Sequence, residues 1–203
     1  MNRCYVTFIQ MVDICNGQYV RDGRVAEHTL RRVYMWYAVQ VETGREETVR
    51  EYFHRLVDRS VYNEIFVIRF NRMKKFYGKW HKESSVMFPG YIFIDTDTPE
   101  PAYEELKKVP VFTSLLGRDK QYFVPIERSK EELFRSMLDD NHEIAISTGL
   151  IEGDKVIITD GPLAGKEAMI KKINRHKRIA ILNVTMFGES VGVTVGLEIV
   201  EKR

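Results

Sequence analysis

Two closely spaced turns within residues 153–166 restrict most strongly what this chain can fold into. The first turn, at 153–154, precedes a short apolar run, and the second, at 160–162, follows that run directly. Glycine adopts backbone angles that other side chains forbid, and proline presets the angle that a turn requires. Gly165 then precedes another apolar run. The order strand, tight loop, strand predicts the start of a small β-barrel, whose function we expect on its surface.

The length of 203 residues and a hydrophobic content of 44% allow one or two compact domains. No apolar run is long enough to cross a membrane, and the first residues lack the pattern of a secretion signal, so we expect no membrane partner. The two cysteines, Cys4 and Cys15, fit no common zinc pattern. These features favour a reducing, cytoplasmic location.

The charge distribution suggests where the domains divide. The net charge of +2 is too small to indicate nucleic-acid binding by itself. Residues 139–148 contain acidic side chains but no lysine or arginine, and they separate a mixed region from a region of strands alone. We therefore predict a domain at 34–138, a linker at 139–148 and a barrel at 149–203. Residues 1–33 are interpreted as a poorly ordered extension, with a real extra strand and helix as the alternative.

The region after Met35 predicts an α+β domain with a mostly antiparallel sheet. Thr43 and Ser129 each have a glutamate three residues later, the pattern of a helix capping box. The run 90–95 is apolar throughout, which indicates a central strand. The predicted elements are strands at 36–41, 65–70, 79–87, 90–95 and 111–116, and helices beginning at Thr43, Pro99 and Ser129.

Nothing in the sequence indicates an enzyme. The five histidines have no cysteine, carboxylate or second histidine at a metal-ligand spacing. The glycines at 161 and 165 lack the Lys-Ser/Thr pair and the helix that a phosphate-binding loop requires. We therefore predict no catalytic residue, no metal and no cofactor.

Two basic segments are candidates for nucleic-acid binding, because cations contact phosphates and aromatic rings stack on bases. In the segment 69–82, cations alternate with aromatic residues, and the possible contacts are Arg72, Lys74, Lys75 and Lys79. The alternative there is a solvated hairpin whose aromatic rings pack on the sheet. The second segment surrounds Asn174 at a predicted hairpin tip in the barrel, and the alternative is an ordinary polar turn. Its candidate RNA-binding residues are Lys171, Lys172, Arg175, His176, Lys177 and Arg178.

A third candidate surface is apolar. If helices cover only one face of the sheet, some of its aromatic residues are exposed and mark a protein partner, and for each residue the alternative is a place in the core. The set comprises Trp36, Phe88, Tyr91, Phe93, Phe112 and Leu115.

Three motifs resemble the NusG/Spt5 family of transcription elongation factors. Residues 36–44 are similar to the opening strand and helix of the family's N-terminal domain, and 87–94 to its Phe-Pro-Gly-Tyr strand. Residues 153–165 are similar to the KOW motif of its C-terminal barrel. The resemblance implies an α+β NusG-type domain followed by an all-β, SH3-like KOW barrel. The basic run 171–178 and the strands after it are most similar to the LoaP branch of the family.

The resemblance also implies a function, that of a monomeric factor for transcription elongation and processive antitermination. Its N-terminal domain would bind the clamp helices of RNA polymerase, and its KOW domain an RNA hairpin in the nascent leader transcript. The residues carried over for the polymerase are Trp36, Phe88, Phe93, Phe112 and Leu115. The acidic segment 42–47 argues against DNA recognition by the first helix. The alternatives are a housekeeping NusG that couples polymerase to a ribosomal protein or Rho, and a ribosome-associated RNA-binding protein.

Overall fold

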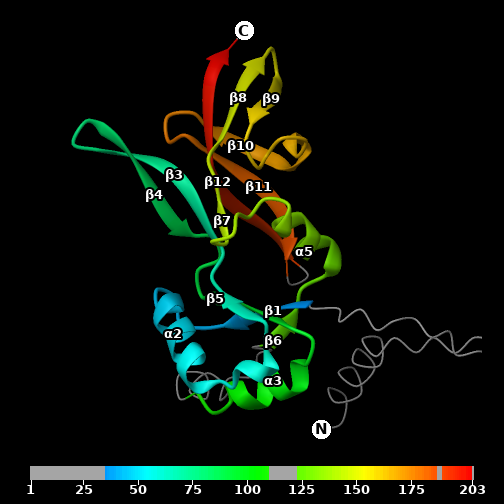
Figure 1. Ribbon diagram of the computed structural model, residues 1–203. Helices are drawn as coiled ribbons and strands as arrows, with labels where there is room; N and C mark the ends of the chain where they lie inside the picture. Colours follow the sequence, from blue (N-terminus) through cyan, green and yellow to red (C-terminus); the bar gives the residue numbers. More distant parts are fainter. Residues whose placement is uncertain (1–34, 110–122, 187–188, 203) are drawn as a thin grey trace, which may run out of the picture. The chain divides into compact units, whose positions relative to one another are not determined.

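The computed structural model describes residues 35–109, 123–186 and 189–202 (Figure 1). All of them belong to one compact unit that begins at Val33. The extension interpreted at 1–33 and the strand predicted at 111–116 lie outside the described residues. No helix in the described part of the chain is long and apolar enough to cross a membrane.

The N-terminal domain contains a four-stranded antiparallel sheet with the strand order β2-β5-β1-β6. The predicted central strand is confirmed, because β5 lies between β2 and β1. The bounds of the strands are β1 Met35–Gln40, β2 Glu64–Phe66, β5 Tyr91–Thr96 and β6 Phe123–Pro125. The helices are α2 Glu46–Leu56, α3 Pro99–Leu106 and α5 Arg128–Arg135, with a 3-10 turn η1 at Arg59–Val61.

Helices cover both faces of this sheet, not one face as the sequence suggested. Successive strand residues point to opposite faces, so Val39 and Trp36 belong to different hydrophobic clusters. Val39 packs in the cluster that contains Phe53 of α2, and Trp36 in the cluster that contains Phe134 of α5. The aromatic residues of the sheet are therefore mostly core residues.

The predicted helix caps are wrong, although the helices exist. Arg45 is the N-cap of α2, and Glu46 is the first helical residue. The Glu46 carboxylate is buried and accepts hydrogen bonds from the backbone N–H groups of Gly44, at 3.0 Å, and Gly90, at 2.6 Å. Burial raises the pKa of Glu46, but the backbone N–H groups of Gly90, Gly44 and Glu46 itself, together with the charge of Arg69, outweigh it and the pKa is lowered. Glu46 therefore joins the start of α2 to the loop before β5. In α5 the N-cap is Glu127, not Ser129.

A second sheet contains the strands β3 Arg69–Phe76, β4 Lys79–Val86 and β7 Glu143–Ile144, in the order β4-β3-β7. Figure 1 shows β3 and β4 as a long hairpin. The strand predicted at 65–70 is divided, because β2 and β3 belong to different sheets. The segment 139–148, interpreted as a linker, contains β7, which pairs in parallel with β3, and the first residues of the barrel strand that follows.

The barrel domain forms a five-stranded sheet with the order β10-β11-β12-β8-β9. The two predicted turns surround β9, and Gly161 has a φ of 98°. A Cβ at Gly161 would lie 2.7 Å from the Cα atom of Ser147, so this turn requires glycine. Every second residue of β11 faces the core, so Ala180, Leu182 and Val184 are buried. The strands are β8 Ser147–Glu152, β9 Lys155–Asp160, β10 Ile170–Asn174, β11 Ile179–Met186 and β12 Glu189–Lys202, with a 3-10 turn η2 at Glu167–Met169.

The barrel strand β12 approaches β3 closely at Gly196. A Cβ atom added to Gly196 would lie 2.2 Å from the backbone oxygen of Asn71 and 2.9 Å from Cγ1 of Ile146. A side chain does not fit between these two backbones, so the contact depends on glycine.

Candidate nucleic-acid and protein interfaces

The predicted hairpin tip of the barrel is the turn between β10 and β11. Asn174 pairs with Ile179, which leaves residues 175–178 in the turn. The Asn174 side-chain oxygen accepts a hydrogen bond from the backbone N–H of Lys177 at 3.0 Å, so the turn is locally ordered. A register shift between Ile170 and Lys172 interrupts the pairing of β10. Lys171 and Lys172 are consecutive in this strand, yet both are exposed.

Five side chains of this segment are available to a ligand, and we call them the basic turn. They are exposed, and the described residues provide no acidic partner within ion-pair distance of them. Four of the five carry a permanent positive charge, which suits them to a phosphate backbone. The basic turn consists of Lys171, Lys172, Arg175, His176 and Lys177.

Arg178, the sixth predicted RNA-binding residue, has a different environment. Its Nη1 atom lies 2.8 Å from the carboxylate of Glu198, and its guanidinium group lies 4.2 Å from the ring centre of Trp80. Its φ of 50° is unusual for a residue with a side chain. These contacts hold Arg178 in place, so we assign it a positioning role beside the basic turn.

The β3–β4 hairpin contains the second predicted basic segment, and its cations are of two kinds. Arg72 and Lys74 both pair with Glu83, at 2.8 and 2.9 Å. The hydrogen bond from Lys74, followed by the one from Arg72, lowers the pKa of Glu83. Lys75 and Lys79 lie nearer the tip and are exposed, with no acidic partner among the described residues. Only two of the four predicted contact residues are therefore free to bind phosphate.

The predicted protein-docking residues that the structure describes are in the core. Trp36, Phe88 and Phe93 are 2%, 6% and 1% exposed. Phe93 packs at 5.7 Å from Phe88 and 6.5 Å from Trp36, measured between ring centres. Phe134 of α5 covers Phe88 at 5.5 Å. Phe112 and Leu115 lie outside the described residues. Docking through this set stays a prediction, and direct contact with the three buried rings requires α5 to move.

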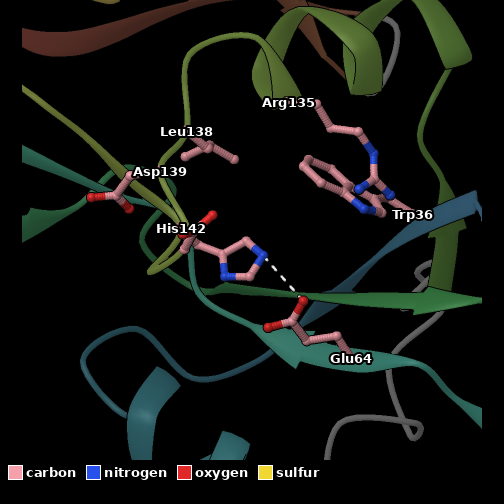
Figure 2. A pocket seen from close by; sticks show the side chains of 7 residues that line it. Trp36, Glu64, Arg135, Leu138, Asp139 and His142 are labelled. Carbon is pink, nitrogen blue, oxygen red and sulfur yellow. Dashed lines mark ion pairs between the residues drawn. The ribbon is translucent and has the colours of Figure 1, made fainter.

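A pocket of about 300 Å³ lies beside Trp36 on this face of the sheet (Figure 2). On one side the guanidinium group of Arg135 lies 4.6 Å from the ring centre of Trp36. Arg135 also binds Asp95 at 2.9 Å and Glu131 at 2.8 Å, so it is firmly fixed. The residues that line the pocket are Trp36, Glu64, Arg135, Leu138, Asp139, Asp140 and His142.

His142 closes the other side of the pocket. Its ring stacks on Phe66 with 3.9 Å between the ring centres, and its Nε2 atom lies 3.3 Å from the Glu64 carboxylate (Figure 2). Burial lowers the pKa of His142, although the charge of Glu64 acts in the opposite direction. Sequence reasoning missed this pocket, and only the spacing of Glu131 and Arg135 by one helical turn could have suggested part of it. The described residues contain no cluster of side chains that could hold a metal ion.

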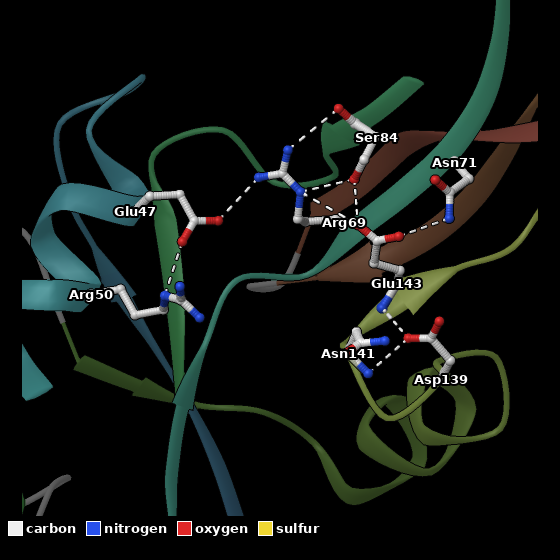
Figure 3. A network of polar contacts seen from close by, with 8 residues as sticks. All are labelled: Glu47, Arg50, Arg69, Asn71, Ser84, Asp139, Asn141 and Glu143. Carbon is white, nitrogen blue, oxygen red and sulfur yellow. Dashed lines mark hydrogen bonds and ion pairs between the residues drawn. The ribbon is translucent and has the colours of Figure 1, made fainter. Parts of the chain in front are cut away.

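A polar network fixes the segment before the barrel to the N-terminal domain (Figure 3). Glu143 of β7 accepts hydrogen bonds from Asn71 at 2.9 Å and Ser84 at 2.5 Å. Arg69 donates to Ser84 at 2.9 Å and to Glu47 of α2 at 3.0 Å. The network connects α2, β3, β4 and β7, so the segment that leads into the barrel is anchored on the base of the β3–β4 hairpin.

Comparison with known proteins agrees with the order of the two domains. The family model "Transcription termination factor nusG" matches residues 34–135, and the KOW motif matches residues 152–187. The chain is 24% identical to the "Transcription termination/antitermination protein NusG" of Haemophilus influenzae, over 88% of this chain and 99% of that protein. It is 25% identical to the protein of the same name from Pseudomonas aeruginosa, over 82% and 97%. A solved structure described as "Domain interaction in Thermotoga maritima NusG" covers 80% of this chain and 93% of its own, at 21% identity and a TM-score of 0.45.

Proposed function

Since the chain belongs to the NusG family, whose members are transcription factors and not enzymes, we propose that it acts in transcription termination or antitermination by binding RNA polymerase. More specifically, it acts as a processive antitermination factor of the LoaP type. The N-terminal domain binds the polymerase, and the KOW domain binds a hairpin in the nascent leader RNA.

The observation that carries the RNA part is the basic turn. Lys171, Lys172, Arg175 and Lys177 are exposed on a locally ordered hairpin, and no acidic side chain of the described residues neutralises them. Clustered lysine and arginine side chains bind phosphates and release counterions, which makes binding strong at low salt. An exposed cluster of cations on a locally ordered turn suits the phosphate backbone of a folded RNA.

For RNA polymerase, we propose docking on the face of the N-terminal sheet that contains Trp36, Phe88 and Phe93, with Phe112 and Leu115 as further contacts. Contact with the rings themselves requires α5 to move, and the pocket beside Trp36 is the part of this face that is accessible while α5 stays in place. Clamp helices held there would favour the processive state of the polymerase. The size of the effect equals the difference between the affinities of the factor for the two polymerase states.

A second candidate is the housekeeping function, in which the barrel links polymerase to a ribosomal protein or to Rho. The names of the relatives favour it, because they describe both termination and antitermination. The two functions differ in whether the factor needs a particular leader RNA.

Transcription through a terminator, on templates with and without a leader hairpin, tests the proposal. We expect readthrough that depends on the hairpin and that is lost when Lys171, Lys172, Arg175 and Lys177 are all changed to Gln. Lys155→Gln is the matched control, since Lys155 is exposed at the start of β9 in the same domain. Equal readthrough on both templates would contradict the antitermination proposal and favour the housekeeping function.

A further inference from the structure

The tip of the β3–β4 hairpin exposes two aromatic rings. Phe76 is 58% exposed and Tyr77 is 91% exposed, and their ring centres lie 4.3 Å apart. Large aromatic residues usually gain stability by burial, and these two rings bury little against the rest of the chain. Their position is therefore not explained by the hydrophobic core.

The backbone of this tip is that of a tight two-residue turn. Phe76 pairs with Lys79, and the residues between them, Tyr77 and Gly78, have φ values of 47° and 78°. A turn with positive φ at both positions favours Asn-Gly, and a tyrosine there is costly. A ring in an unfavourable backbone conformation, almost fully exposed, points to a function at the tip.

Charge decides which kind of partner fits these rings. Residues 69–83 contain six lysine and arginine side chains and one acidic side chain, Glu83. Glu83 pairs with Arg72 and Lys74, which leaves Lys75 and Lys79 as exposed cations beside the rings. Aromatic rings between free cations match unpaired nucleotides, whose bases stack while their phosphates are neutralised.

The tip is also linked to the basic turn. Trp80 pairs with Lys75 in the hairpin, and Arg178, which follows the basic turn directly, lies over the ring of Trp80 at 4.2 Å. A further contact joins the base of the hairpin to the barrel, where Gly196 meets the backbone of Asn71. An RNA bound at the basic turn can therefore continue along the hairpin.

We propose that Phe76 and Tyr77 stack on unpaired nucleotides next to the RNA stem that the basic turn binds. Lys75 and Lys79 contact the phosphates of these nucleotides. This inference rests on the proposed function for the identity of the RNA, and it assigns the β3–β4 hairpin of the N-terminal domain to the same ligand as the barrel.

The test uses the full chain and two RNA probes, a blunt stem-loop and the same stem-loop with a single-stranded oligouridine tail. The variant combines Phe76→Ser with Tyr77→Asn, because Asn-Gly favours this turn and preserves the hairpin. Tyr52→Ser is the matched control, a partly exposed aromatic residue on α2. We expect the tail to increase the affinity of the wild type and of the control about tenfold, since stacking contributes about 1–3 kcal/mol per base. The variant should lose this gain and bind the blunt stem-loop as the wild type does.

Two outcomes overturn the inference. In the first, the tail does not increase the affinity of the wild type. In the second, the tail increases the affinity of the variant as much as that of the wild type; a loss of affinity for a free DNA strand or for RNA polymerase in that variant would then assign the tip to that partner. If the wild type binds no stem-loop, the proposal for the basic turn fails separately. Ultraviolet cross-linking of free oligouridine then tests the aromatic tip alone, with the label expected on Phe76 or Tyr77 and its absence there counting against the inference.

Discussion

The aromatic cluster of the N-terminal sheet and the basic turn of the barrel were both predicted as binding surfaces, and the structure places them in opposite environments. Trp36, Phe88 and Phe93 are almost completely buried, whereas Lys171 to Lys177 include five exposed side chains. Apolar residues have two possible uses, in a core or in an interface, and a sequence does not separate them. Clustered cations are not buried in a core, so the exposure of the basic turn could be predicted from the sequence, whereas the burial of the aromatic cluster could not.

The two basic hairpins show a finer difference. In the β3–β4 hairpin, Glu83 neutralises Arg72 and Lys74 from the opposite strand. In the basic turn, the described residues offer no such partner, except that Glu198 holds the neighbouring Arg178. The number of cations in a segment therefore overstates what is free to bind a ligand.

The largest expected effect compares the two surfaces directly. Phe93→Ser should reduce the free energy of unfolding by about 3–5 kcal/mol, because it removes a fully buried ring and leaves a cavity. Arg175→Ser should change it by less than about 0.5 kcal/mol, because Arg175 is exposed and has no ion-pair partner among the residues that the structure describes. Urea denaturation measures both values. Similar stabilities of the two variants would contradict the contrast between core and surface.

The contact between the hairpin and the barrel should give the next largest effect. Gly196→Ala is expected to cost about 1–3 kcal/mol, since its Cβ would overlap the backbone oxygen of Asn71. Gly192→Ala in the same strand is the control, because there the Cβ meets only the Cγ2 atom of Ile181, at 3.2 Å. The stabilities of the two variants are compared by thermal denaturation. An equal loss of stability in both would contradict the close approach of β12 and β3.

The neighbouring residues Lys177 and Arg178 should have different roles, one in RNA binding and the other in stability. Arg178→Ala is expected to lower stability by about 1 kcal/mol through loss of the Trp80 and Glu198 contacts. Lys177→Ala should leave stability unchanged and weaken RNA binding. Stability and RNA affinity are measured for both variants. Stability is also measured for Trp80→Ala and for the double variant of Arg178→Ala with Trp80→Ala. An additive double variant would show that Arg178 and Trp80 do not interact.

The smallest expected effect concerns pH and the pocket beside Trp36. Burial lowers the pKa of His142, so the unfolded chain binds this proton more readily than the folded protein does. Stability should therefore fall as the pH decreases below about 6.5, the ordinary pKa of histidine, until the pH is below the folded-state pKa. His142→Asn, which tolerates the φ of 58°, should flatten this dependence. The free energy of unfolding is measured between about pH 7 and pH 5 for the wild type and for His142→Asn. The same change with pH in both proteins would show that His142 does not cause the dependence.

The sequence predicted the elements better than their ends and their partners. Turn residues and hydrophobic periodicity located β5, the β3–β4 hairpin and the strands of the barrel, because these signals are local. The cap of α5 is Glu127 instead of the predicted Ser129. The predicted cap of α2 was wrong, since Glu46 is held by Gly90, a residue far along the chain. The same reason explains the division of the strand at 65–70 and the missed pocket around His142. Both depend on contacts between distant segments.

The salt dependence of RNA binding tests the role of the basic turn most directly. The dissociation constant of a stem-loop RNA is measured over a range of salt concentrations for the wild type and for the variant with Lys171, Lys172, Arg175 and Lys177 changed to Gln. Each phosphate contact contributes about 0.7–0.9 to the slope of log affinity against log salt, so the slope should decrease in magnitude by about 3. Lys155→Gln should retain nearly the wild-type slope. An unchanged slope in the fourfold variant would show that the basic turn does not bind the RNA.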